Sequence, residues 1–365
     1  MPYPRVQPER IRVFPLAQRQ SKSCITDIVA DPDAPPPLAD EMVKAVQTAA
    51  EKIRAARQGG AAVILAFGAH LVKNGLAPVL IRLTEEGWVT HLAGNGACAI
   101  HDWEFSWLGR SEEDVRANVA AGCFGTWDET GKFINLAVQV NALRDMGYGE
   151  AVGALIEEER LIIPPAEELR QIIRQEEPQR MPTAAELLVT LKKLGLQSGV
   201  LQVPHPFKRF SIFGNAFRLQ VPMTVHPGIG YDIIYNNPFA NGGALGRAAH
   251  LDFQTMVHSV GNLNGGVFLS VGSAIMAPQV FEKSLSFANN LRLQAGEPIV
   301  GDFTMVINDL QAAAWDWTQG EPPKSSPDYY FRFLKSFYRM GGEVLYAAGD
   351  NRVFLGNLYA LLKAM

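Results

Sequence analysis

The stretch AAVILAFGAHLVKNGLAPVLIRLTEEGWVTHLAGN, residues 61–95, decides the fold. Its first seven residues are all apolar, as in strands that a parallel sheet buries on both faces. Residues 68–87 show the apolar spacing of a helix with a break near Pro78, and residues 88–100 predict a second strand and its loop. A strand, a helix and a strand in this order predict a β-α-β unit.

The same alternation returns in the second half of the chain. A strand with a loop is predicted over residues 265–274, a helix over 278–292 and a further strand over 302–309. We therefore expect an α/β fold with a doubly wound, mostly parallel sheet and crossover helices. The proline-rich residues 1–40 predict an extended arm, and residues 41–365 predict a single nucleotide-binding domain.

Composition and charge exclude several classes of partner. The 365 residues carry a net charge of −4 with dispersed basic residues, which argues against nucleic acid. The apolar stretches fall short of the ~20 residues that span a bilayer, and the N-terminus lacks the apolar core of a signal peptide. Three cysteines without CxxC spacing fit thiols that stay reduced. We expect a cytoplasmic protein that binds neither nucleic acid nor membrane.

Glycine and small polar residues follow four of the expected strands. Ligands of open α/β sheets bind at the carboxyl ends of the strands, where such residues let backbone approach a phosphate. GxGxxG after a strand, GxxxxGK[ST] and GxSxG are all absent, which argues against an ordinary dehydrogenase, a P-loop ATPase and an α/β-hydrolase. The four loops are Gly68-Ala69-His70, Asn95-Gly96-Ala97-Cys98, Gly272-Ser273-Ala274 and Asn308-Asp309.

Three polar groups invite a chemical role. His101, beside Asp102 and Glu104, could act as a general base, or this segment could be an acidic helix start. His226 and Asp232 form a second candidate pair, or a rigid corner. A third group suggests a metal hydrolase or a surface role, and it consists of His250, Asp252 and His258, with His70 or His226 completing the set.

Several of these segments resemble deoxyhypusine synthase, in the same order along the chain. GNGACAIHD, residues 94–102, is similar to the dinucleotide loop of that family, and PGIGYD, residues 227–232, is similar to its amine-binding segment. Gly272-Ser273-Ala274 resembles a Gly-Gly-Gly strand end, and Ile307-Asn308 resembles another strand end. Pro327-Asp328-Tyr329 resembles the segment before the lysine that forms an imine, and Lys335 stands at the matching distance.

The resemblance implies a Rossmann-like fold and an NAD-dependent transferase that acts on a polyamine or a related small amine through a lysine imine. It implies a homo-oligomer, a tetramer or a dimer, and no metal ligands. The family's glutamate pair reads Ile100-His101, and its histidine falls on Pro278 or Gln279. A catalytically eroded nucleotide-binding protein and a metal-dependent hydrolase therefore remain as alternatives. The implied catalytic residues are Lys335, His101 and Asp232, and the implied NAD-binding residues are Gly68, His70, Asn95, Gly96, Ala97, Gly272, Ser273, Ala274 and Asn308.

Overall fold

The computed structural model describes residues 3–313, 315 and 317–364, and these fall into two compact units. This division differs from the predicted arm and single domain, because the boundary lies after residue 27 and the rest of the chain is shared between the two units. Unit 1 also contains Ala99–Arg218 and Pro227–Asp252. Unit 2 contains Ile28–Cys98, Leu219–His226 and residues 253–364.

Unit 2 is built on a six-stranded sheet in which all neighbouring strands run parallel. The order across the sheet is β10-β9-β8-β2-β3-β7. Counted along the chain from the β7 edge, this is the order 3-2-1-4-5-6 of the Rossmann fold. The prediction of a doubly wound parallel sheet is therefore confirmed. The strands are β2 (Val63–Phe67), β3 (His91–Asn95), β7 (Met223–His226), β8 (Gly266–Val271), β9 (Phe303–Asp309) and β10 (Glu343–Ala348).

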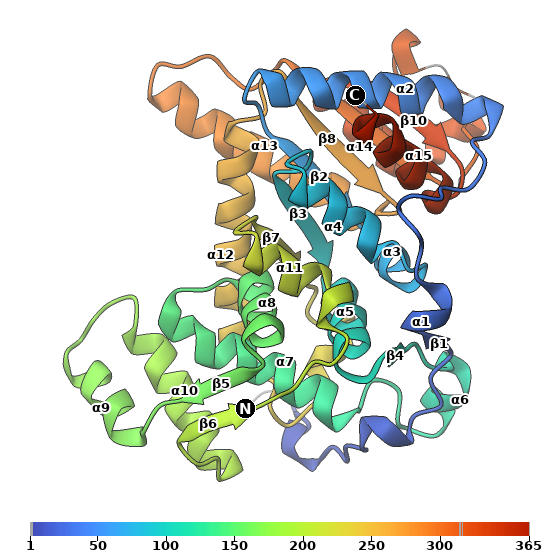
Figure 1. Ribbon diagram of the computed structural model, residues 1–365. Helices are drawn as coiled ribbons and strands as arrows, with labels where there is room; N and C mark the ends of the chain where they lie inside the picture. The colour runs from blue at the N-terminus through green and yellow to red at the C-terminus, as the bar shows by residue number, and fades with distance from the viewer. Residues whose placement is uncertain (1–2, 314, 316, 365) are drawn as a thin grey trace. The chain divides into compact units, whose positions relative to one another are not determined.

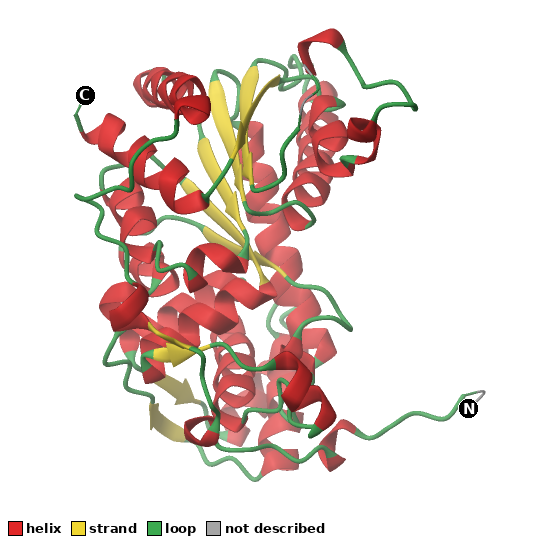
Figure 2. Cartoon of the chain, turned by 90° about the vertical axis from the view of Figure 1, so that its right-hand side faces the viewer, coloured by secondary structure: helices red, strands yellow, loops and turns green. Residues whose placement is uncertain are grey.

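Helices cover both faces of this sheet, as Figure 1 and Figure 2 show. A large core cluster joins side chains of one sheet face to α12, α13 and α14, and it includes the stacked rings of Phe268 and Phe281. Helices α2, α4 and α15 pack together on the other face. The bounds are α2 (Asp40–Gln58), α4 (Ala77–Glu85), α12 (Gly242–Gly261), α13 (Met276–Gln294), α14 (Arg332–Tyr338) and α15 (Asn351–Lys363).

The sequence of residues 61–95 explains the local structure around β2. All five residues of β2 are buried, as expected for a strand with helices on both faces. The predicted helix after β2 is divided into α3 (Ala69–Lys73) and α4, and Pro78 lies in the first turn of α4, where its missing N–H costs nothing. Gly75, between them, has a φ of +74°, and a Cβ there would lie 2.0 Å from the Ile28 carbonyl oxygen.

Unit 1 consists mainly of helices with two small antiparallel sheets. Strands β1 (Ser23–Cys24) and β4 (Arg110–Ser111) form one sheet, and β5 (Arg160–Ile163) and β6 (Gly199–Gln202) form the other. Three of the described helices, α1, α5 and α12, begin in one unit and end in the other. The helices not yet named are α1 (Ile25–Ile28), α5 (Gly96–Leu108), α6 (Val115–Ala120), α7 (Asp128–Asn141), α8 (Tyr148–Glu158), α9 (Ala166–Arg174), α10 (Met181–Leu194) and α11 (Ile212–Arg218).

Over the described ranges, every helix is too short or too polar to cross a bilayer.

Candidate cofactor site at the carboxyl edge of the sheet

The four predicted loops lie at the carboxyl ends of four adjacent strands in unit 2. Gly68 follows β2, Asn95 ends β3, Gly272 follows β8, and Asn308 lies near the end of β9. These strands are neighbours in the order β9-β8-β2-β3. The predicted cofactor-binding residues therefore gather along one edge, although this placement alone does not test their roles.

The backbone is tightly packed between the loops that follow β2 and β8, where the winding direction of the chain reverses. A Cβ added to Gly68 would lie 2.0 Å from the carbonyl oxygen of Gly272. Gly272 has a φ of +57°, and a Cβ there would lie 2.8 Å from Nδ2 of Asn351. Gly68 has no room for a side chain against the Gly272 backbone, and the positive φ of Gly272 favours glycine there as well. This is the switch point at which doubly wound sheets bind ligands.

A cavity of about 210 Å³ opens at this edge. Its lining comes from the loops and helix starts that follow four strands, namely β2, β8, β9 and β10. Whole-ligand pockets usually enclose about 300 to 1,000 Å³, so a cavity of this size suits one part of a larger ligand. The lining residues are His70, Asn74, Gly272, Asp309, Leu310, Asp350 and Asn351.

The cavity offers mainly hydrogen-bond acceptors. Asp350 accepts from the backbone N–H of Arg352 at 2.7 Å and so caps α15, while Asp309 accepts from the N–H of Gln311 at 3.2 Å. Asn351 is 6 % exposed, and its buried Oδ1 meets no hydrogen-bond donor from the described part of the chain. A carboxylate oxygen accepts more than one hydrogen bond, so these groups can also accept from a ligand.

Asn308 lies beside these residues on β9 and is held in one orientation. Its Nδ2 donates to the carbonyl oxygens of Ala347 and Gly349, at 2.9 and 3.1 Å. This leaves Oδ1 buried, with no partner within the described ranges. An acceptor without a donor is costly to bury, so a ligand that donates here would gain affinity.

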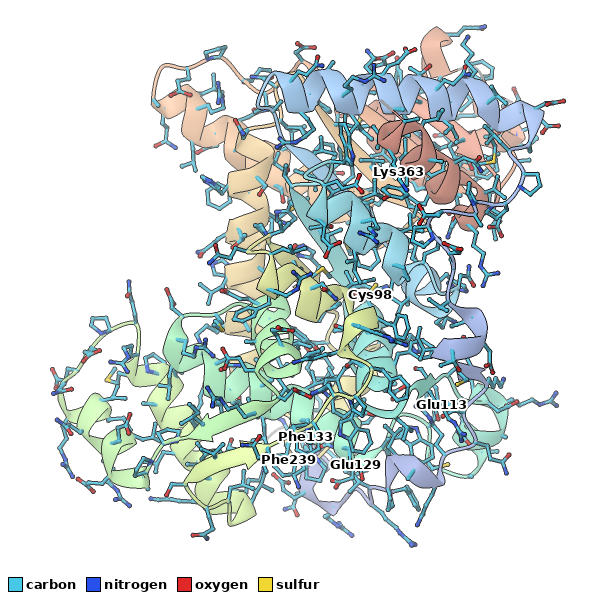
Figure 3. All side chains as sticks on the ribbon, in the orientation of Figure 1. Cys98, Glu113, Glu129, Phe133, Phe239 and Lys363 are labelled. Atoms are coloured by element: carbon cyan, nitrogen blue, oxygen red, sulfur yellow. The ribbon has the colours of Figure 1, made fainter. Side chains whose placement is uncertain are left out.

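Asn95, Gly96 and Ala97 form a helix start rather than the predicted open loop. Oδ1 of Asn95 accepts from the backbone N–H of Cys98 at 3.1 Å and contacts its Sγ at 3.2 Å. Gly96 is the first residue of α5. Cys98, which is labelled in Figure 3, lies in the first turn of this helix. The Asn95 side chain therefore caps α5.

His70 and Ser273 also lie at this edge, but in different settings. His70 is in the first turn of α3 and lines the cavity. The hydroxyl of Ser273 accepts from the N–H of Ala277 at 3.3 Å, in the first turn of α13, and so helps to start that helix. Ala274 packs against the main core cluster.

The three predicted catalytic residues are not all in one unit. Lys335 belongs to unit 2 and His101 and Asp232 to unit 1. Nζ of Lys335 lies 3.4 Å from Glu321 and 3.6 Å from the centre of the Tyr329 ring, and Lys335 does not belong to the cavity lining. Asp232 accepts from the N–H of Gly228 at 2.7 Å, and burial raises the pKa of its carboxyl group.

His101 belongs to a buried polar network in unit 1. Ser111 Oγ donates to Glu104 at 2.6 Å and lies 2.7 Å from Nδ1 of His101. Because the serine has one proton and gives it to the carboxylate, Nδ1 of His101 must carry a proton and donate to Ser111. This contact fixes the orientation of the His101 ring.

The neighbours of His101 in the motif have structural partners. Asp102 accepts from Ser211 Oγ at 2.5 Å and from the N–H of Ile212 at 2.7 Å, so it caps α11. Asp252, of the third candidate group, accepts from the N–H of Gly149 at 2.9 Å at the start of α8. In the residues that the structure describes, no three His, Cys, Asp or Glu side chains are grouped as a metal would require.

Neither a protein-family model nor a curated protein matches the chain. Solved structures do show similarity. AgrE in complex with ornithine and NAD+ is 14 % identical with a TM-score of 0.45, over 90 % of this chain and 34 % of that one. ArgZ, an arginine dihydrolase from the ornithine-ammonia cycle in cyanobacteria, is 15 % identical with a TM-score of 0.40, over 89 % and 33 %. A conserved LOR/SDH protein from Methanococcus maripaludis S2 is 13 % identical with a TM-score of 0.43, over 91 % and 74 %.

These findings correct the expected relationship to deoxyhypusine synthase, which is wrong. The similar solved structures include AgrE, ArgZ and the LOR/SDH protein. Short segments such as PGIGYD misled because glycine-rich turns follow the strands of many α/β proteins. The chain spans about a third of the length of the AgrE and ArgZ chains that it matches.

Proposed function

We propose that unit 2 binds NAD at the carboxyl edge of its sheet and that the protein is an NAD-dependent enzyme acting on a small amine. One observation carries the proposal. The sheet has the 3-2-1-4-5-6 strand order, and its switch point, where Gly68 and Gly272 meet, opens onto a cavity lined by hydrogen-bond acceptors. Dinucleotides bind across the switch point of sheets with this order.

The residues of the edge fit a dinucleotide, with one departure from the usual pattern. A pyrophosphate binds where the backbone can approach it closely. The loops after β2 and β8 allow this at Gly68 and Gly272, which have no side chains. In the usual dinucleotide fold, an acidic residue in the first half of the sheet binds a ribose hydroxyl. Here Asn95 ends β3 in that half, and its side chain caps α5. Asp309 offers a carboxylate in the second half of the sheet, where it would accept from a ribose hydroxyl.

The amine is supported by the charge of the cavity. Asp309 and Asp350 contribute two carboxylates, and the cavity lining contains no lysine or arginine. A carboxylate of a small concave site that the cofactor does not use, here that of Asp350, attracts a cation. A substrate with an ammonium group therefore fits this end of the site better than a carboxylic acid does. When bound, NAD would accept a hydride from the substrate.

The first experiment compares NAD binding to two aspartate variants at opposite ends of β9. Asp309→Ala removes a cavity carboxylate, and Asp302→Ala removes an exposed aspartate just before the strand. NAD at ~100 times its dissociation constant should stabilise the wild type by ~2.7 kcal/mol in thermal melting. Loss of one charged hydrogen bond costs about 1.5 to 3 kcal/mol, so Asp309→Ala should bind NAD about tenfold or more weakly.

Asp302→Ala is expected to behave as the wild type. Equal affinity in the two variants would contradict the assigned cavity, and no stabilisation by millimolar NAD would contradict NAD binding altogether.

The second experiment follows absorbance of reduced nicotinamide with primary amines and with the corresponding alcohols. Amines should be oxidised in preference to alcohols. NAD binding without turnover of any amine would favour a nucleotide-binding protein that is not an enzyme.

A further inference from the structure

The N-terminal arm and the segment around the end of η5 (Ile233–Tyr235) line a second cavity, and all of its lining residues belong to unit 1. The volume of this cavity is about 690 Å³. Pockets for small molecules usually enclose about 300 to 1,000 Å³, so the cavity has room for a whole ligand. None of its lining residues belongs to the cofactor site in unit 2.

Both walls of this cavity are held in place by the fold of unit 1. On the arm, the N–H of Arg10 donates to the Gln7 carbonyl oxygen at 3.1 Å and closes a tight turn. Further along the arm, the N–H of Phe14 donates to the Thr126 carbonyl oxygen at 2.9 Å. On the other wall Asn237 is 1 % exposed, so this side belongs to the packed body of the unit.

The lining carries two positive charges and no negative one. Arg5 and Arg10 are its charged residues, and both are exposed. Glu9, which lies between them in the sequence, forms an ion pair with Lys193 on α10 instead. Over the described ranges, neither arginine takes part in an ion pair. The cavity is therefore positive, although the chain as a whole carries a net charge of −4.

The polar side chains of the lining add hydrogen-bond donors. Burial raises the pKa of the Tyr235 phenol, and the charges of Asp232 and Tyr231 raise it further, so the hydroxyl keeps its proton at neutral pH. Asp232 itself is not part of the lining. The side-chain amides of Gln7 and Asn236 can also donate. Cations and donors on one concave surface favour an anion.

We propose that this cavity binds an organic phosphate. A guanidinium binds phosphate through two parallel N–H donors, and two guanidiniums balance the charge of about −1.5 to −2 that a phosphate monoester carries at neutral pH. A single carboxylate would balance only one of them. Half-buried Ile11 and the Tyr235 ring offer apolar surface to an organic group. The proposal does not depend on NAD binding in unit 2.

Calorimetric titration of the full chain with phenyl phosphate, inorganic phosphate and benzoate tests the class of ligand. Phenyl phosphate should bind in the millimolar range or more tightly. Benzoate has one charge fewer and inorganic phosphate lacks the ring, so each should bind about tenfold or more weakly. Equal affinity for benzoate would overturn the preference for phosphate, and equal affinity for inorganic phosphate would overturn the role of the organic group.

Three arginine variants test the location of the site. Arg5→Gln and Arg10→Gln each remove a charged donor from the lining and should weaken phenyl phosphate binding about tenfold or more. Arg12→Gln is the matched control, because the Arg12 guanidinium lies 4.9 Å from the centre of the Phe14 ring and Arg12 is not part of the lining. All three arginines are exposed, so the variants should melt as the wild type does.

Arg12→Gln should keep wild-type affinity for phenyl phosphate. An equal loss in all three variants would mean that the general charge of the arm attracts the anion, and unchanged affinity in Arg5→Gln and Arg10→Gln would place the anion elsewhere, so either result would overturn the site. Saturating NAD should leave phenyl phosphate binding unchanged, and displacement by NAD would overturn a separate site. Failure of the wild type to bind millimolar phenyl phosphate would overturn the proposal and leave NAD binding in unit 2 untouched.

Discussion

Glu104 is a fully buried carboxylate whose partner, Arg19, comes from the N-terminal arm. Both guanidinium nitrogens of Arg19 contact it, at 2.8 and 2.7 Å, and the Thr130 hydroxyl donates to it at 2.8 Å. The two side chains of the ion pair are 2 % and 0 % exposed. The segment that suggested general-base chemistry thus also fastens the arm to α5.

Removal of the Arg19 cation should lower the free energy of unfolding. Arg19→Met leaves Glu104 charged and buried, and breaking a buried pair in this way costs about 3 to 5 kcal/mol of unfolding free energy. Arg19→Met combined with Glu104→Gln should recover much of the loss, because the uncompensated charge is gone. Urea unfolding measures both. A loss of less than about 1 kcal/mol in the single variant would show that the pair carries little energy.

Asp102 gives a prediction that depends on pH. Burial raises the pKa of its carboxyl group to about 7 from the usual 3.8, although Ser211 and two backbone N–H groups partly oppose the rise. The folded protein therefore holds this proton more tightly than the unfolded chain does. Its contribution to stability is complete below about pH 4 and is lost as the pH rises towards about 7.

Asp102→Asn removes this titration but keeps a side chain that can cap α11. The wild type should therefore lose stability relative to Asp102→Asn as the pH rises from about 4 to about 7. Unfolding free energies of both proteins across this range provide the measurement. Parallel pH profiles would show that Asp102 titrates normally in the folded protein.

At the scale of elements, the loops after β2 and β8 depend on each other. Gly68→Ala places a methyl group 2.0 Å from the Gly272 carbonyl oxygen, so one loop must move. Overpacking of this kind costs about 1 to 3 kcal/mol, and the displaced loop should also bind NAD less tightly. Thermal melting and calorimetric titration measure the two effects.

Gly301→Ala is the matched control at the amino end of β9. A Cβ there meets its nearest atom at 4.0 Å, so stability and NAD affinity should stay as in the wild type. Similar losses in Gly68→Ala and Gly301→Ala would mean that alanine is tolerated equally at both ends of the sheet, and the tight packing at the switch point would then have no special role.

The sequence predicted the elements that have strong local patterns. The apolar run of β2 and the runs of β3, β8 and β9, with the small residues after them, were sufficient to place four strand ends of the cofactor edge. β10 was missed because it lies at the sheet edge and five of its six residues are only half-buried or exposed among mixed side chains. Asp350 and Asn351 were missed with it, although Gly349-Asp350 after an apolar stretch is the same signal.

At the scale of the whole molecule, the sequence did not reveal the two units. Unit 1 is assembled from three separate segments, and residues 99–218 enter the chain between β3 and β7. Hydrophobic periodicity reports whether a segment is a helix or a strand, but not which distant segments share a core. The predicted single domain followed from reading the β-α-β alternation as continuous across this long insertion.

The division gives the two units different expected responses to NAD. Ligand binding protects the amide hydrogens that it orders, and the proposed site lies within unit 2. Hydrogen–deuterium exchange with and without saturating NAD is therefore the most direct test of the central claim. We predict slower exchange at residues 67–74, 271–275, 308–311 and 349–352, which follow β2, β8, β9 and β10. Unchanged exchange in all four segments, or protection confined to unit 1, would contradict NAD binding at the carboxyl edge of the sheet.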